Sequence, residues 1–363
     1  AQWWGDVTVL MGESFYTFSP SHALLTRKGI RELVNWQRPD STLHSPIPGN
    51  YNHELPAQML ASVGHYGFWH YYMNSADSAT LAHAYPGVKK YLGVWKLDDT
   101  GLTEFRPGEW SWGDWGDNID IRLLLAAWHY MALKGASAMA VELGMPQDTI
   151  EYSTSMKRIA TAFNRCWTGT AYRHPQYHKD TDDRVQAMAI LTGIAGPDKY
   201  DALKKTLHSK EHASPYMEKY VMEALFAIGD GRYAMDRMKR RFSTMVNDTE
   251  CTTLFEGWEE GTYGGGSTNH AWSGGAITVI AQDVCGLRPT APGWREFVIE
   301  PQFDIFGECA IEVPTVAGTI KSAYRHTENG ISMHIEVPEG TTASLILPDG
   351  TKTLRPGSHD INF

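Results

Sequence analysis

The sequence predicts a mainly α protein, an (α/α)6 barrel followed by a small antiparallel β-sandwich domain, in a chain of 363 residues. Two observations carry this prediction. From Val7 to about Gly286 apolar residues recur at spacings of three and four, and after Gly286 they alternate at every second position. Turn-forming residues separate the periodic runs in both parts. We therefore divide the chain into a helical domain at residues 1–288 and a β domain at residues 289–363.

The helical part contains about eleven candidate helices, identified by their apolar stripes and by the breakers between them. They are expected at roughly residues 7–17, 20–37, 54–74, 77–93, 118–143, 147–165, 182–194, 197–208, 215–228, 231–246 and 270–285. Breakers such as Gly144-Met145-Pro146 and Gly196-Pro197-Asp198 mark helix ends between antiparallel neighbours. Because short and long loops alternate between these helices, a closed double ring is favoured over a simple bundle.

The β part shows strand alternation and two hairpin signals. Ile331, Met333 and Ile335 occupy alternate positions, and Asn329-Gly330 just before them is the sequence of a type I′ turn. Asp349-Gly350 repeats the turn signal between two further short runs. These signals predict an antiparallel unit of about 75 residues.

Charge and hydropathy exclude two classes of partner. The chain has 32 Lys and Arg against 42 Asp and Glu, a net charge of −10, and no long basic run, so nucleic acid is not an expected partner. The longest apolar stretch, around Leu123 to Leu133, is interrupted by His129 and is shorter than the roughly 18 residues of a membrane span. We expect a soluble protein, which is periplasmic or secreted if a leader before Ala1 was removed and cytoplasmic otherwise.

Three segments crowd tryptophan, glycine and acidic residues into expected loops, where a site on a rigid helical ring would be built. They cover residues 1–6, 109–117 and 252–273. The chain has 13 Trp and 17 Tyr, and flat aromatic rings of this kind suit the C–H faces of sugars. A structural interpretation competes with this hypothesis, because Asp6 and Asp117 each lie next to the start of an expected helix and would serve as caps.

The third segment carries the strongest candidate. Glu256 lies between Phe255 and Trp258, while Asn269 and His270 follow a glycine-rich turn and can hydrogen-bond ring hydroxyls. That turn lacks the lysine of a phosphate-binding loop. The sequence also lacks a zinc-type His or Cys spacing and a G-x-S-x-G elbow, so no metal and no cofactor are expected. Carboxylates and aromatic rings without a metal fit glycoside hydrolysis.

With these motifs the chain resembles glycoside hydrolase family 78, the α-L-rhamnosidases. The resemblance covers nearly the whole chain: W-x-G-D at Trp3 to Asp6, a G-D-W loop, T-T-L-F-E-G-W around Glu256, and S-T-N-H-A-W around His270. It implies an (α/α)6 barrel, hydrolysis with inversion, and a rhamnose-containing glycoside as the partner. Glu256 matches the family's general base, and His270 matches the histidine that supports it.

The resemblance also assigns the sugar contacts. Trp3 matches the tryptophan that packs against rhamnose, and Asp6, Asp114 and Trp115 match positions near its hydroxyls. The candidate substrate-binding residues are Trp3, Asp6, Trp112, Trp115, Asp117, Trp258, Asn269 and Trp272. Asp114 is offered either as a sugar contact or as an acid.

One departure concerns the general acid, which the family places a few residues before W-x-G-D and therefore upstream of Ala1. The resemblance thus implies a fragment of a longer enzyme. Within the chain, Asp114, Asp117 and Glu109 are the acids that could replace it, and loss of a general acid costs about 10²–10⁴ in rate.

Two alternatives stay open. Another (α/α)6 exo-glycosidase would share the architecture, whereas a phosphorylase would carry basic residues beside Glu256 and a lyase would avoid loops as acidic as these. A non-catalytic carbohydrate-binding protein of the same fold would keep the tryptophans and tolerate loss of Glu256.

Overall fold

The computed structural model describes residues 2–49, 53–261 and 266–363. The α-helices are α1 (Trp4–Thr17), α2 (Ala23–Asn35), α3 (Pro56–Val63), α4 (His70–Ser75), α5 (Ser78–Val94), α6 (Ile121–Glu142), α7 (Asp148–Asn164), α8 (Asp183–Leu191), α9 (Tyr200–Ser209), α10 (Pro215–Ala227), α11 (Gly231–Val246) and α13 (Gly275–Val279). Part of the glycine-rich turn before His270, residues 262–265, and the first residue, Ala1, lie outside the described residues.

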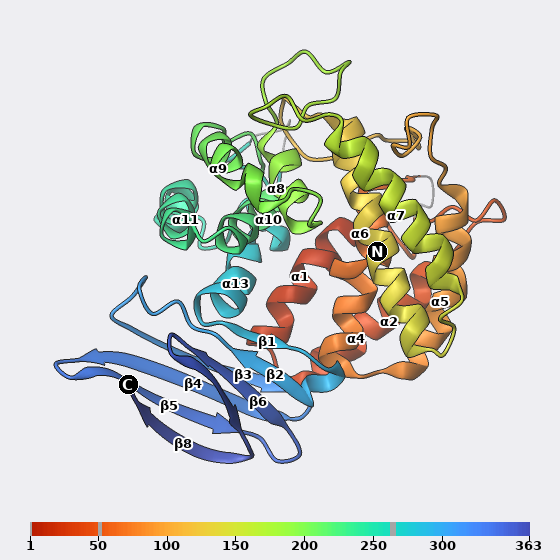
Figure 1. The fold of residues 1–363 in the computed structure, drawn as a ribbon. Helices are drawn as coiled ribbons and strands as arrows, with labels where there is room; N and C mark the ends of the chain where they lie inside the picture. Colours follow the sequence, from red (N-terminus) through yellow and green to blue (C-terminus); the bar gives the residue numbers. More distant parts are fainter. Residues whose placement is uncertain (1, 50–52, 262–265) are drawn as a thin grey trace.

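The helices form a closed double ring (Figure 1). In the inner ring α1, α3, α6, α8, α10 and α13 each contact the next helix, and α13 contacts α1 again. The outer helices α2, α5, α7, α9 and α11 pack against this ring or against one another. Inner helices bury side chains all round, as Leu123, Leu124 and Leu125 of α6 illustrate. The predicted (α/α)6 barrel is therefore confirmed.

Two expected helices are divided. The one expected at 270–285 consists of a 3-10 helical segment at Ala271–Gly274, α13, and a π-helical segment at Ile280–Val284. Close helix packing explains the other break. The helix expected at 54–74 consists of α3, a π-helical segment at His65–Trp69, and α4. At Gly64 a Cβ atom would lie 2.6 Å from the Cα of Ala132 on α6, and at Gly135 one would lie 2.4 Å from Gly64. Since only glycine allows this approach, the backbone of the inner ring changes its path where it crosses α6.

Two capping interpretations from the sequence are wrong. The N-cap of α6 is Asp120, whose side chain accepts a hydrogen bond from the Leu123 N–H, so the helix begins at Ile121 and Asp117 lies outside it. Asp6 lies inside the first turn of α1, where the N-cap is Trp3. A carboxylate in the first turn still interacts favourably with the helix dipole.

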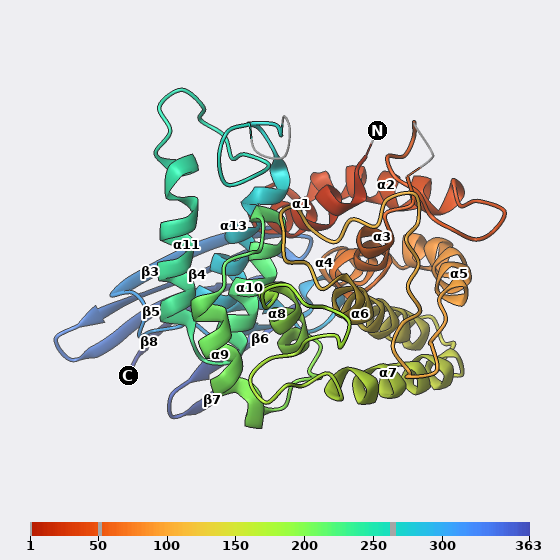
Figure 2. The same cartoon turned by 90° about the horizontal axis from the view of Figure 1, so that it is seen from above.

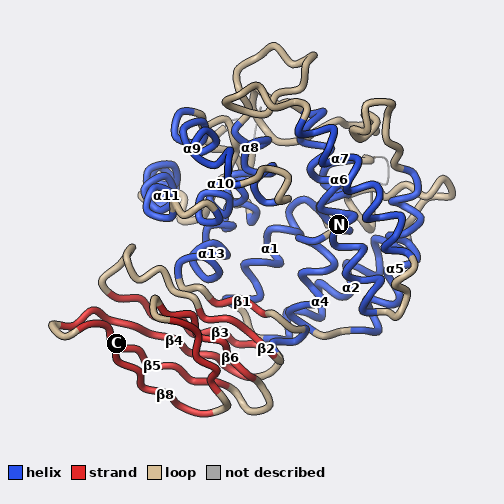
Figure 3. Tube along the Cα trace, in the orientation of Figure 1, coloured by secondary structure: helices blue, strands red, loops and turns tan. Residues whose placement is uncertain are grey.

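The strands form two four-stranded sheets gathered on one side of the helical ring (Figure 3). They are β1 (Leu287–Pro289), β2 (Glu296–Ile299), β3 (Glu308–Thr315), β4 (Gly318–Thr327), β5 (Gly330–Val337), β6 (Thr342–Leu347), β7 (Gly350–Leu354) and β8 (Gly357–Asn362). The sheet orders are β1-β2-β6-β7 and β3-β4-β5-β8. All pairs are antiparallel except β2 with β6, which is parallel.

The two predicted hairpins are present, one residue earlier than expected. Thr327 pairs with Gly330 and Leu347 pairs with Gly350, so the glycines begin the returning strands instead of lying within the turns. Both glycines have positive φ, 128° and 144°, which explains their strong turn signal.

Helix α1 connects the barrel to the β domain. Near its end Tyr16 packs edge-on against Trp294 with ring centroids 5.9 Å apart, and its hydroxyl donates to the Leu287 carbonyl at 3.0 Å. Trp294 in turn donates from Nε1 to Asn74 at 3.1 Å. The predicted boundary between residues 288 and 289 falls within β1 and stays a prediction. Among the described helices none is long and apolar enough to cross a membrane.

Candidate active site

A cavity of about 240 Å³ opens where the chain enters α1. It is lined by Trp3, Asp6, Gln58, Trp110, Trp112, Trp115, Glu256, His270 and Trp272. These residues come from α1, α3, the loop before α6 and the segment between α11 and α13, which passes close to α1 (Figure 2). The structure thus brings all three tryptophan-rich segments together, as the sequence predicts for a loop-built site.

The backbone around Glu256 is fixed by pairing between the two halves of the third segment. The Glu256 N–H donates to the Ser267 carbonyl at 2.8 Å, and the His270 N–H donates to the Leu254 carbonyl at 2.8 Å. Trp272 donates from its indole N–H to the Glu256 carbonyl at 3.1 Å. These hydrogen bonds hold Glu256 and His270 side by side although 14 residues separate them in sequence, the difference of their numbers.

Each oxygen of the Glu256 carboxylate accepts a hydrogen bond from a different donor. Trp115 donates from Nε1 to Oε1 at 2.9 Å, and the Ser267 N–H donates to Oε2 at 2.9 Å. His270 Nδ1 lies 3.4 Å from the same Oε2. Since the side chain of Glu256 keeps 16% of its exposure, a water molecule or hydroxyl can still reach the carboxylate.

His270 bridges two carboxylates. Its Nδ1 faces Glu256 and the Ser267 hydroxyl, at 3.4 and 2.8 Å, while its Nε2 lies 2.6 Å from Asp6 Oδ1. The side chains of His270 and Asp6 are 19% and 25% exposed. An imidazole in this place can orient the Glu256 carboxylate.

Tryptophans form the wall of the cavity. Trp112 stacks on Trp272 with ring centroids 5.6 Å apart and an interplanar angle of 14°, and Trp115 lies edge-on to Trp112 at 5.8 Å. Trp3 and Trp110 at the rim are each 40% exposed. Buried rings behind exposed ones give a rigid apolar platform, as a sugar ring requires.

Two residues of this cavity were missed as candidates from the sequence. Trp110 belongs to the second tryptophan-rich segment, whose density was its signal. Gln58 lies on α3 (Pro56–Val63), in which all residues are buried. It has the longest polar side chain of that helix. Its Oε1 and the Trp112 Nε1 are buried and have no hydrogen-bond partner among the described residues.

Asp114 does not line the cavity, contrary to the prediction. It is buried, its Oδ2 accepts from Arg184 Nη1 at 3.1 Å and from the Ser214 N–H at 2.9 Å, and the Ser214 hydroxyl donates to its Oδ1. Burial raises the pKa of Asp114 to about 6, although Arg184 and Ser214 lower it. The carboxylate therefore holds the second tryptophan-rich segment against α8 and α10.

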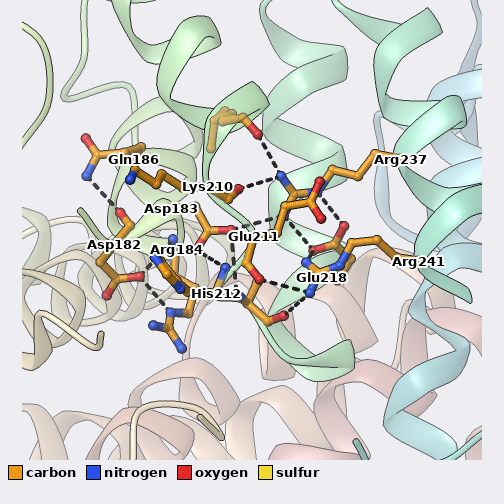
Figure 4. Close-up of polar contacts among 12 residues, drawn as sticks. Asp182, Asp183, Arg184, Gln186, Lys210, Glu211, His212, Glu218, Arg237 and Arg241 are labelled. Carbon is orange, nitrogen blue, oxygen red and sulfur yellow. Dashed lines mark hydrogen bonds and ion pairs between the residues drawn. The ribbon is translucent and has the colours of Figure 1, made fainter. Parts of the chain in front are cut away.

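Through its ion pair with Arg184, Asp114 belongs to a buried network of acids and arginines. Figure 4 shows the rest of this network: Asp182 accepts from Arg184, Asp183 and Glu218 accept from Arg237, and Glu218 also accepts from Arg241. The side chains of Arg184 and Arg237 are 0% exposed. The network connects α8, α10 and α11 behind the cavity.

Four other predicted acids and contacts lie elsewhere. Asp117 and Asn269 are exposed and do not line the cavity. Trp258 donates to the Ala213 carbonyl at 2.9 Å and lies under the guanidinium of Arg241, 4.1 Å from its ring centroid, so it packs structurally. Glu109 accepts from the Glu54 N–H at 2.8 Å, outside the cavity.

One group in the described part of the chain offers metal-ligand atoms within 4.8 Å of one another: His44, Glu54 and Glu109. Arg106 donates to Glu54 at 3.0 Å and Arg38 donates to Glu109 at 3.1 Å. Because these arginines already neutralise both carboxylates, the group is better described as an ion-pair cluster than as a cation site.

Two solved structures that share this fold are both described as α-L-rhamnosidases. The α-L-rhamnosidase from Dictyoglumus thermophilum is 21% identical, with a TM-score of 0.85 over 99% of this chain and 45% of that chain. The Streptomyces avermitilis α-L-rhamnosidase, solved with L-rhamnose, is 20% identical, with a TM-score of 0.81 over 99% of this chain and 38% of that one. The double ring followed by a β domain is the fold that this chain shares with both structures.

The family follows from the sequence. Residues 1–284 match the bacterial α-L-rhamnosidase six-hairpin glycosidase domain, and residues 286–362 match the bacterial α-L-rhamnosidase C-terminal domain. This chain belongs to the bacterial α-L-rhamnosidase family, which confirms the resemblance to glycoside hydrolase family 78. A curated α-L-rhamnosidase of Streptomyces avermitilis is 25% identical over 95% of this chain, and one of Alteromonas sp. is 22% identical over 77%. The chain spans 35% and 33% of those two relatives.

Proposed function

We propose that this chain provides the sugar-binding and water-activating part of an inverting α-L-rhamnosidase, which releases terminal L-rhamnose from glycosides. The observation that carries the proposal is the Glu256 carboxylate, held by Trp115 and Ser267, facing a tryptophan-lined cavity and bridged by His270 to Asp6. Two curated relatives of the chain are named α-L-rhamnosidases.

In this proposal Glu256 is the general base. It accepts a proton from a water molecule while that water attacks the anomeric carbon, and the glycosidic oxygen leaves from the opposite face of the ring. A single displacement inverts the anomeric configuration. His270 orients the carboxylate, and Asp6 keeps His270 in position from the other side.

The unpartnered polar atoms support sugar binding. A buried polar atom without a partner costs about 1–3 kcal/mol. The Gln58 carbonyl oxygen can accept from a sugar hydroxyl and the Trp112 indole N–H can donate to one. Trp3 and Trp110 would cover the C–H faces of the ring.

Hydrolysis of 4-nitrophenyl α-L-rhamnoside tests the proposal, because nitrophenolate leaves with little help from a general acid. Glu256→Gln is expected to lower the rate by about 10²–10⁴. Affinity for L-rhamnose, measured by calorimetry, should stay within about tenfold of the wild type. Glu260→Gln, an exposed neighbour, serves as the matched control and should change the rate by less than about twofold.

The outcomes separate the proposal from its alternative. Equal turnover in Glu256→Gln would remove Glu256 from the role of base, and α-L-rhamnose as the first product anomer in an NMR time course would exclude inversion. No release by the wild type, together with a rise of the melting temperature on adding L-rhamnose, would favour a carbohydrate-binding protein.

A further inference from the structure

Two cysteines from different domains meet at the base of the barrel. Cys285 directly follows the π-helical segment Ile280–Val284 at the end of the inner ring, and Cys309 is the second residue of β3. Their sulfur atoms lie 3.0 Å apart, and the chain between them runs through β1 and β2. The other two cysteines lie elsewhere, Cys166 in the helical core and Cys251 after α11.

The sulfur contact is too short for unrelated neighbours. Non-bonded carbon atoms, which are smaller than sulfur, rest roughly 3.5–4.0 Å apart. A disulfide bond measures about 2.05 Å, so a displacement of about 1 Å would join the two sulfurs.

The two thiols differ in their surroundings. Cys285 is 4% exposed, and its hydrogen bond with Cys309, followed by burial, raises its pKa. The same hydrogen bond lowers the pKa of Cys309, which is partly exposed. Cys309 shares its face of β3 with Ile311 and packs against the core of the β domain, where it stays partly exposed while Cys285 is buried. An external oxidant can therefore reach Cys309 first.

We propose that Cys285 and Cys309 are a cross-linking site, at which a small-molecule or protein disulfide oxidises the pair and ties the barrel covalently to the β domain. The Cys309 thiolate attacks one sulfur of the oxidant, forms a mixed disulfide and releases one thiolate. Cys285 then attacks the Cys309 sulfur, its proton passes to the second departing thiolate, and the oxidant leaves as two thiols. Two electrons pass from the cysteine pair to the oxidant.

The cross-link would hold the last inner helix to the first long strand of the β domain. It closes a loop of 24 residues, the separation of the two positions, and removes conformational freedom from the unfolded chain. The inference is independent of the proposed function, because neither cysteine lines the cavity at the other end of α1.

Thiol mapping of the folded chain tests the site. The protein is incubated with oxidised glutathione, denatured, alkylated with N-ethylmaleimide and digested for mass spectrometry. The expected result is alkylation of Cys166 and Cys251 alone, with a cross-linked peptide containing Cys285 and Cys309 that is about 2 Da lighter than its two parts. Four alkylated cysteines, or a glutathione adduct that persists on Cys309, would overturn the proposal.

Thermal unfolding provides the second measurement. Oxidation should raise the melting temperature of the wild type by on the order of 5 °C and that of Cys309→Ser by less than about 1 °C. Cys251→Ser is the matched control and should retain the full rise. Equal rises in the wild type and Cys309→Ser would contradict the cross-link, and the peptide map of the wild type stands if the variant does not fold.

Discussion

The cavity around Glu256 and the acid–arginine network around Arg184 and Arg237 both contain several carboxylates, but the hydrogen-bond partners of these carboxylates differ. In the network Asp114, Asp182 and Glu218 each meet an arginine and are buried. In the cavity Glu256 meets an indole N–H, a backbone N–H and a histidine, and it stays partly exposed. Carboxylates matched by arginine hold the loops in place, whereas those matched by weaker donors remain available to a substrate.

Glu13 offers a third case. It lies two helical turns beyond Asp6 on the same helix, it is buried, and none of its hydrogen bonds involves an arginine in the described part of the chain. Burial raises the pKa of Glu13 to about 8, although Lys219 lowers it. A buried acid without an arginine is therefore kept protonated over a wide range of pH.

The largest effect is expected from breaking the network. Arg184→Met should destabilise the protein by about 3–5 kcal/mol, because it leaves the buried carboxylates of Asp114 and Asp182 without their counter-charge. Urea denaturation followed by circular dichroism measures the loss. Arg240→Met, which removes an exposed pair with Glu211, is the control and should cost less than about 1 kcal/mol. Equal losses would mean that burial of the network contributes nothing.

The second prediction concerns pH and Glu13. Since the pKa of Glu13 is about 8 in the folded protein against 4.5 for the free side chain, the folded state binds more protons between these values. Stability should thus fall as pH rises from about 4.5 to 8. Glu13→Gln should remove on the order of 2 kcal/mol of this fall, measured as denaturation free energies at both ends of the range. Exposed Glu104→Gln should leave the slope unchanged, and an unchanged slope in Glu13→Gln would show that Glu13 is ionised throughout.

The third prediction tests the cavity residue that the sequence did not reveal. Gln58→Leu keeps the approximate volume and removes the polar end, so L-rhamnose should bind about 2–10-fold more weakly. Calorimetry measures the affinity, and the melting temperature checks the fold. Unchanged affinity would place the sugar away from α3.

The smallest effect is expected at Asp117. Because its side chain is exposed and lies outside the cavity, Asp117→Asn should change turnover of the aryl rhamnoside by less than about twofold. A tenfold loss would restore Asp117 as a substrate contact and would mean that the second loop moves when sugar binds.

Composition and periodicity predicted the double ring and the three site segments, because each signal is local in sequence. The role of Asp114 was not predictable in this way, since it depends on Arg184 and Ser214, which lie 70 and 100 residues further along the chain. Gln58 was not predicted for a similar reason: it lies on an ordinary buried helix, and only the folded chain brings it to the same cavity as the tryptophans. Whether an acid supports a fold or faces a substrate is decided by its spatial neighbours.

Helix α1 has one consequence for how such a chain can vary. Asp6 faces the cavity and Tyr16 is inserted into the β domain, ten positions later on one continuous helix. These two residues lie about 15 Å apart along the axis, and inserting a single residue between them would turn one end by about 100° relative to the other. Loops around the cavity can change in length, whereas the number of residues between Asp6 and Tyr16 must stay constant to keep both side chains in place. Natural insertions and deletions should therefore avoid this helix.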